Sequence, residues 1–200
     1  MSEVKTNWAM GTPAVLYMVG TSCIGVFALL YGLVTPGALP IIAVLLIACG
    51  IATMILGTIE FARGDILLGS IDMVFGGLIF LGIGFMLGAA SWWLVQTGGL
   101  PDLRMAGYIA IGIALIFFLL LPNVGKVSWS LFTIFIVLGL GIVFLAWGLI
   151  GGVDFGVGPM VWSAICFLLF GLYAFYAATV FITNTVYQAP KLGLGGPIFK

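Results

Sequence analysis

Long apolar segments follow one another along the chain, separated by short links that carry most of its polar, glycine and proline residues. A helix needs about 20 residues to cross the hydrocarbon of a bilayer, at about 1.5 Å per residue. Continuous apolar runs, without the two-residue alternation of a barrel strand, favour helices over strands. The pattern predicts six transmembrane helices over about residues 13–34, 39–59, 66–90, 105–121, 127–150 and 159–182, with a tail over residues 183–200.

Composition places the chain in the membrane. Of its 200 residues, 64% are hydrophobic and 6% are charged, whereas soluble domains carry about 25% charged residues. No segment between the spans is long enough to fold by itself. The prediction is therefore an all-α integral membrane protein with a single six-helix domain over residues 1–200, whose surroundings are the lipid bilayer. Net charge is zero without a basic block, so the sequence gives no indication of nucleic acid as a partner. The 30 glycines predict close packing between helices.

The few basic residues predict the orientation. Six spans put both termini on one side of the membrane, and Arg104 is the one basic residue expected on the other side. The basic residues on the side of the termini are Lys5, Arg63, Lys126, Lys191 and Lys200. By the positive-inside rule, we expect a multi-pass protein of the cell membrane with its N- and C-termini in the cytoplasm.

The sequence contains few residues of the kinds that catalyse reactions or bind metals. It contains no histidine, so the commonest metal ligand and near-neutral proton switch is missing. The three cysteines, Cys23, Cys49 and Cys166, fall inside apolar runs and are expected to be small buried side chains. No Ser/His or His/carboxylate constellation is present. We therefore expect neither an enzyme nor a metal or cofactor site.

One charged stretch, Glu60 to Gly77, stands out. Glu60, Arg63 and Asp65 lie where the second apolar run gives way to the third, and we interpret them as interfacial anchors with a local ion-pair network. Asp72 lies two turns into the third run, where carboxylates usually face a bundle interior or a water-filled cavity. Two interpretations stay open for Asp72: a pore-lining or proton-carrying residue, or a hydrogen-bonded structural residue about 10 Å from the interface.

Several stretches match the spacing of one known family. The segment T-P-A-V-L-Y-M from Thr12 resembles N-P-A-P-L-G-L. The pattern E-x-x-R-G-D-x-x-x-G-S-x-x-x-x-F-G from Glu60 resembles E-x-x-[KR]-G-N-x-F-x-x-T-x-F-x-x-Y-G, and A-F-Y-A-A from Ala174 is similar to A-I-Y-L-A. These signatures are those of the acetate uptake transporter family (YaaH-type succinate–acetate permeases), which the chain resembles over nearly its whole length.

The resemblance implies six helices per subunit, a homo-hexameric ring and a separate path for a small-molecule solute, acetate above all, through each protomer. It implies a substrate-binding loop at the start of the first helix, comprising Thr12, Pro13, Ala14 and Leu16. It also implies an apolar constriction formed by Thr21, Phe75 and Phe135.

Asp72 stands where this family usually has an apolar residue. A fixed negative charge beside the path would repel anions unless it is protonated, which makes Asp72 and Glu60 candidate proton carriers or indicates a different solute. The sequence therefore predicts a transporter or channel for small carboxylates such as acetate, with or without coupled protons.

Two other functions stay open. The stretch V-L-Y-M-V-G-T-S from Val15 is similar to the L-L-Y-V-G-A-V-L opening of the urea/amide channels of the AmiS/UreI type, which also form hexameric rings of six-helix subunits. A membrane subunit without transport activity would need neither a path nor a buried carboxylate.

Overall fold

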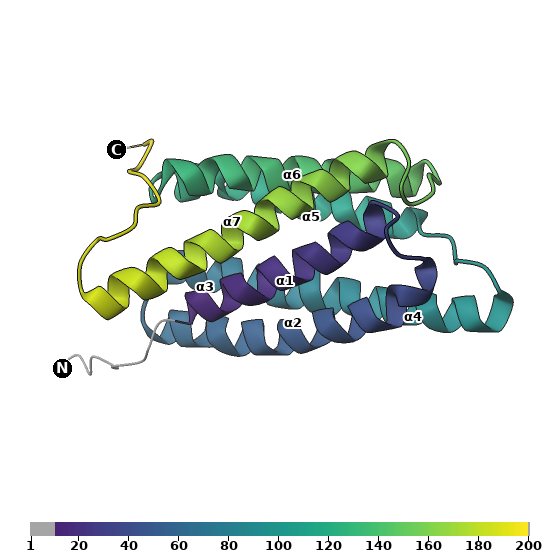
Figure 1. Ribbon diagram of the computed structural model, residues 1–200, viewed down its shortest axis with the longest axis horizontal. Coiled ribbons are helices and arrows are strands. Elements are labelled where there is room, and N and C mark those ends of the chain that lie inside the picture. The colour runs from purple at the N-terminus through teal and green to yellow at the C-terminus, as the bar shows by residue number, and fades with distance from the viewer. Residues whose placement is uncertain (1–10, 200) are drawn as a thin grey trace.

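Six membrane-length helices lie side by side in the computed structural model, which describes residues 11–199 (Figure 1). Their bounds are α1 (Thr12–Leu30), α2 (Leu39–Ala62, preceded by the short η1, Pro36–Ala38), α3 (Ile66–Met73), η2 (Val74–Gly82), α4 (Ile83–Thr97), α5 (Arg104–Gly125), α6 (Trp129–Ile150) and α7 (Pro159–Tyr187). Because α3, η2 and α4 follow one another without a break, they form one span. The predicted all-α membrane fold with six spans is confirmed.

The helices form two groups joined through α1 and α7. One group comprises α5, α6 and α7, and the other comprises α2 with the span α3–η2–α4, while α1 packs on both α7 and α2. The first and last described residues lie at the same end of the bundle (Figure 1), which we call the terminal end, and the opposite end is the far end. Arg63 and Lys126 follow helices that finish at the terminal end, and Arg104 begins α5 at the far end. Lys5 and Lys200 lie outside the described residues.

The third span approaches α2 closely through glycine. A Cβ atom on Gly76 would lie 2.7 Å from Cγ and 2.9 Å from the backbone nitrogen of Met54. Gly84 and Gly50 make similar approaches along the same interface. At this contact the span winds as a π-helix over Val74–Gly82, a conformation that is rare and often found at functional sites. The small residues thus bring two backbones together, as small residues do between membrane helices.

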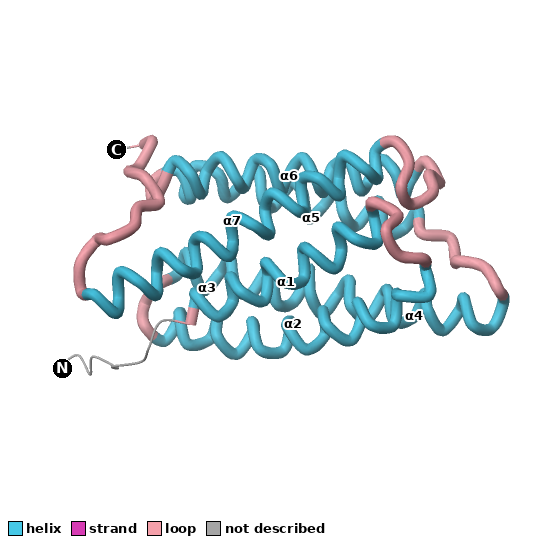
Figure 2. The backbone as a smooth tube through the Cα atoms, viewed as in Figure 1, coloured by secondary structure: helices cyan, strands magenta, loops and turns pink. Residues whose placement is uncertain are grey.

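The tail folds back onto the bundle. The last helix continues past residue 182 to Tyr187, and the segment after it crosses the terminal end to reach α5 and α6 (Figure 2). There the backbone nitrogen of Trp129 donates to Gly196 O at 2.9 Å, and that of Ile198 donates to Gly125 O at 2.8 Å. These bonds fix the tail against the turn between α5 and α6.

Candidate functional site

An open vestibule of about 640 Å³ lies among the loops at the far end of the bundle. Its lining comes from the links between the first two spans, between α4 and α5, and between α6 and α7. Three charged residues line it: Asp102, Arg104 and Asp154. Asp102 Oδ1 lies 3.9 Å from Arg104 Nε and accepts from the backbone nitrogen of Arg104 at 2.9 Å. Among the described residues that line the vestibule, Arg104 is the single cation, and it already has a carboxylate beside it.

A partly open chamber of about 280 Å³ lies below the vestibule, lined by side chains from all six spans, including the exposed Leu78 of η2 and Ile109 of α5. The two spaces share three lining residues, Leu103, Leu149 and Phe155, so they adjoin. Nearly all the chamber wall is apolar. One hydroxyl belongs to it, that of Ser22, which is 1% exposed. Within residues 11–199 the Ser22 Oγ atom has no hydrogen-bond partner.

Four buried phenylalanine rings pack together beside the chamber. We call them the Phe cluster: Phe75 on η2, Phe117 on α5, Phe135 on α6 and Phe170 on α7. The ring centroids of Phe75 and Phe117 are 5.4 Å apart, and those of Phe117 and Phe135 are 5.5 Å apart. Phe170 completes the circuit at 6.2 Å from Phe135 and 6.0 Å from Phe75. These are the separations of packed aromatic pairs, and Phe75 also lines the chamber.

The Phe cluster contains two of the three residues expected at a constriction. Phe75 and Phe135 come together through the rings of Phe117 and Phe170. Thr21 lies elsewhere: its side chain is exposed, and its hydroxyl donates to Tyr17 O at 2.9 Å. The next residue, Ser22, lines the chamber instead. Phe117 and Phe170 escaped the sequence analysis because they stand in uniformly apolar runs, I-F-F and L-L-F, where no pattern distinguishes an inward ring.

Asp72 lies one helical turn from Phe75, on the side of the terminal end. It is 2% exposed and packs against α2, where its Cβ is 3.1 Å from the position that a Cβ on Gly57 would take. In the part of the chain that the structure describes, Asp72 Oδ2 has no hydrogen-bond partner. The same holds for the hydroxyl of Thr53, which is fully buried one turn from Gly57. The charged groups that act on Asp72, Glu60 and Asp65, are both acidic.

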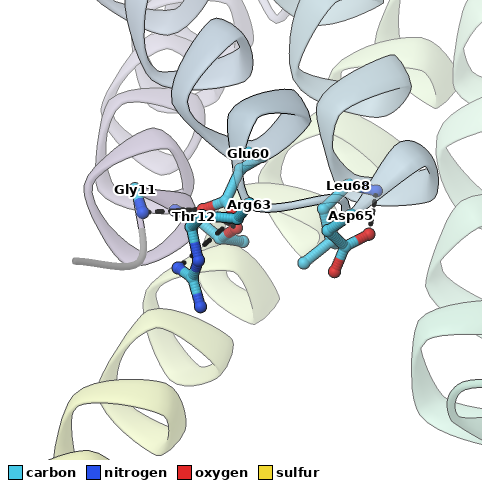
Figure 3. Close-up of polar contacts among 6 residues, drawn as sticks. All are labelled: Gly11, Thr12, Glu60, Arg63, Asp65 and Leu68. Carbon is cyan, nitrogen blue, oxygen red and sulfur yellow. Dashed lines mark hydrogen bonds and ion pairs between the residues drawn. The ribbon is translucent and has the colours of Figure 1, made fainter. Parts of the chain in front are cut away.

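Glu60 caps the start of α1. Its buried Oε1 atom accepts from Gly11 N at 2.7 Å, Thr12 N at 3.2 Å and Thr12 Oγ1 at 3.2 Å (Figure 3). Its Oε2 atom lies 3.5 Å from Arg63 Nη1. A helix start carries free N–H groups and a partial positive charge. The anion at this helix start is thus a carboxylate of the chain itself.

The rest of the expected loop and charged stretch take structural positions. Pro13 is in the first turn of α1, Ala14 is exposed, and Leu16 is half-buried against the core. Asp65 caps α3, with its Oδ1 atom accepting from Leu68 N at 2.9 Å (Figure 3). The expected local ion pair therefore forms between Glu60 and Arg63, while Asp65 serves the next helix.

Comparison with known proteins places the fold. No family model matches the chain, and no curated protein matches it in sequence. Among solved structures, it is similar to "Structure of the bacterial acetate channel SatP", with a TM-score of 0.79 and 19% sequence identity. The likeness covers 94% of this chain and 100% of that chain. The chain therefore has the six-helix fold of that channel.

Proposed function

We propose that this protein is a membrane transporter or channel for small carboxylates such as acetate, with its solute path inside the helix bundle. One observation carries the proposal. A vestibule, a chamber and the Phe cluster lie one after another in space, within a fold shared with an acetate channel. The proposal assigns a transport role and no catalytic residue.

The proposed path selects solutes by their size and controls their passage through the wetting of an apolar constriction. A chamber of about 280 Å³ admits a solute of a few heavy atoms, since one water molecule occupies about 30 Å³ of liquid. Hydrophobic constrictions gate by dewetting, and the Phe cluster supplies such a constriction. At the terminal end, the loop Thr12, Pro13, Ala14 and Leu16 is the proposed substrate-binding segment. A solute carboxylate can accept hydrogen bonds from the free N–H groups at the start of α1 when it displaces the Glu60 carboxylate or binds beside it.

Buried carboxylates and basic residues suggest how protons could be coupled to transport and how the protein is oriented in its membrane. Asp72 and Glu60 are the two buried carboxylates that could carry a proton with the solute. We place the protein in the cell membrane with its terminal end in the cytoplasm, because Arg63, Lys126 and Lys191 gather there. The family resemblance supports a homo-hexamer with one path in each subunit.

A flux panel tests this function. Purified protein in liposomes should take up labelled acetate faster than protein-free liposomes measured at the same pH. Uptake of labelled urea, with acetate excluded, would instead favour the urea/amide channel, a candidate supported by the uncharged chamber wall. Acceleration of neither solute would contradict transport and favour a membrane subunit without a path.

A further inference from the structure

We infer that the path passes its solute in an uncharged form, and that Ser22 is the polar contact that holds it in the chamber. The substrate class is then small neutral molecules of the size of acetate: the undissociated acid, or a primary amide such as acetamide. This inference rests on the proposed transport function and names the species that crosses.

The vestibule does not collect anions. Arg104 is its single cation in the described part of the chain, and Asp102 lies 3.9 Å from the guanidinium nitrogen Nε. Asp154 adds a second negative charge to the lining. Rings of basic residues mark pores that select anions, and this mouth has the opposite balance. An acetate ion therefore meets no unmatched positive charge when it enters.

The chamber penalises charge far more than polarity. Among the described residues that line it none is charged, and the Phe cluster adjoins it through Phe75. Burying an isolated carboxylate in such surroundings costs far more than burying a neutral amide or hydroxyl that keeps a hydrogen bond. An uncharged solute of the same shape can therefore cross where its anion cannot.

Ser22 supplies the hydrogen bond that a neutral polar solute needs. Ser22 lines the chamber, and its Oγ atom is fully buried and has no partner within residues 11–199. A serine hydroxyl both donates and accepts, so it can bond a carbonyl oxygen as well as an amide or acid hydrogen. Buried polar groups normally have partners, and a solute in the chamber would supply the partner that Ser22 lacks.

The terminal side of the Phe cluster offers no cation to an anion either. Of the described residues that are buried and charged, both are acidic: Glu60 and Asp72. The Glu60 carboxylate occupies the start of α1 and pairs with Arg63. Asp72 repels an anion when ionised and gives it no positive charge when protonated. The whole interior thus favours uncharged solutes.

Two measurements on the same protein test the inference. Undissociated acetic acid crosses lipid unaided, so the readouts are acetamide influx by stopped-flow light scattering and electrical current carried by acetate across a planar bilayer. We expect severalfold faster acetamide influx than in protein-free vesicles and no acetate current.

A current that reverses at the acetate equilibrium potential would overturn the inference while leaving transport intact. Accelerated, electroneutral acetate uptake without acetamide influx would overturn the extension to amides, since the path would then require a carboxyl group. If neither solute is accelerated and no current flows, the proposed function itself fails.

The proposed role of Ser22 is tested by comparing two single variants with the wild type. Ser22→Ala should slow acetamide influx severalfold, with the melting temperature unchanged. Thr58→Ala is the control, because Thr58 is exposed on α2 and its hydroxyl bonds to Met54 O of its own helix. Equal acetamide rates for Ser22→Ala and the wild type would remove Ser22 from the path.

Discussion

At the scale of single residues, Phe75 joins the chamber to the Phe cluster, the proposed constriction, because its ring lines the first and takes part in the second. Phe75→Ala should open the constriction and let larger carboxylates, such as butyrate, cross. Phe85→Ala is the matched control, since Phe85 lies in the same span but is 62% exposed. The measurement is the rate of uptake across a series of chain lengths in proteoliposomes.

Stability must be followed in the same experiment. Removing a buried phenylalanine side chain costs about 3–5 kcal/mol, so Phe75→Leu provides a milder second variant. If both variants remain folded and keep the solute range and rate of the wild type, Phe75 contributes packing alone.

A substitution at Asp72 distinguishes two mechanisms: the proton is carried either by this side chain or by the solute itself. Passage of the undissociated acid predicts that Asp72→Asn keeps the pH dependence of acetate uptake, because the proton then travels on the solute. The other titratable groups that act on this position are Glu60, from α2, and Asp65, from the start of α3. Initial uptake rates on both sides of neutral pH check the expectation. A flat profile in Asp72→Asn would assign Asp72 as the carrier.

The sequence analysis identified some of these residues, but it did not predict which side chains of α1 face the bundle interior. The family resemblance pointed to Phe75 and Phe135, which the fold brings into the Phe cluster, but an alignment does not give the rotation of a helix. Successive residues of a helix point about 100° apart, so a shift of one position turns Thr21 outward and Ser22 into the chamber. The partner of Glu60 was equally hidden, since 48 positions separate it from Thr12.

At the scale of elements, the π-helical segment depends on its contact with α2. Gly76→Ala would put a Cβ 2.9 Å from the Met54 backbone nitrogen, so the two helices must separate. We expect a loss of about 1–3 kcal/mol, as for other overpacked interiors. Gly77→Ala is the matched control, because in the same segment a Cβ there meets nothing within 4 Å. Thermal unfolding in detergent compares them, and equal midpoints would contradict the close contact.

Apolar run length predicts the spans well because bilayer thickness fixes how many apolar residues each helix needs. It does not predict the π-helical winding over Val74–Gly82, since that conformation follows the approach of α2, a tertiary contact. The docked tail is hidden for a similar reason. Its Gly- and Pro-rich sequence is typical of a loop, and the bonds that hold it run to the backbone at Gly125 and Trp129.

At the scale of the whole molecule, the outer face of the bundle carries many exposed apolar side chains, which suits both lipid and neighbouring subunits. The proposed homo-hexamer predicts a particle of six chains in mild detergent, measured by native mass spectrometry or light scattering. A single chain under the same conditions would contradict it.

The central claim is that solute crosses through the chamber, and filling that chamber tests it most directly. Ala110 lines the chamber, so Ala110→Trp places an indole in a space of about 280 Å³. Ala89→Trp adds the same group on the exposed surface of α4. In proteoliposomes of the correctly folded variants, we predict that Ala110→Trp lowers accelerated uptake to the protein-free rate, while Ala89→Trp transports like the wild type. Wild-type uptake by Ala110→Trp would show that the solute does not pass through the chamber.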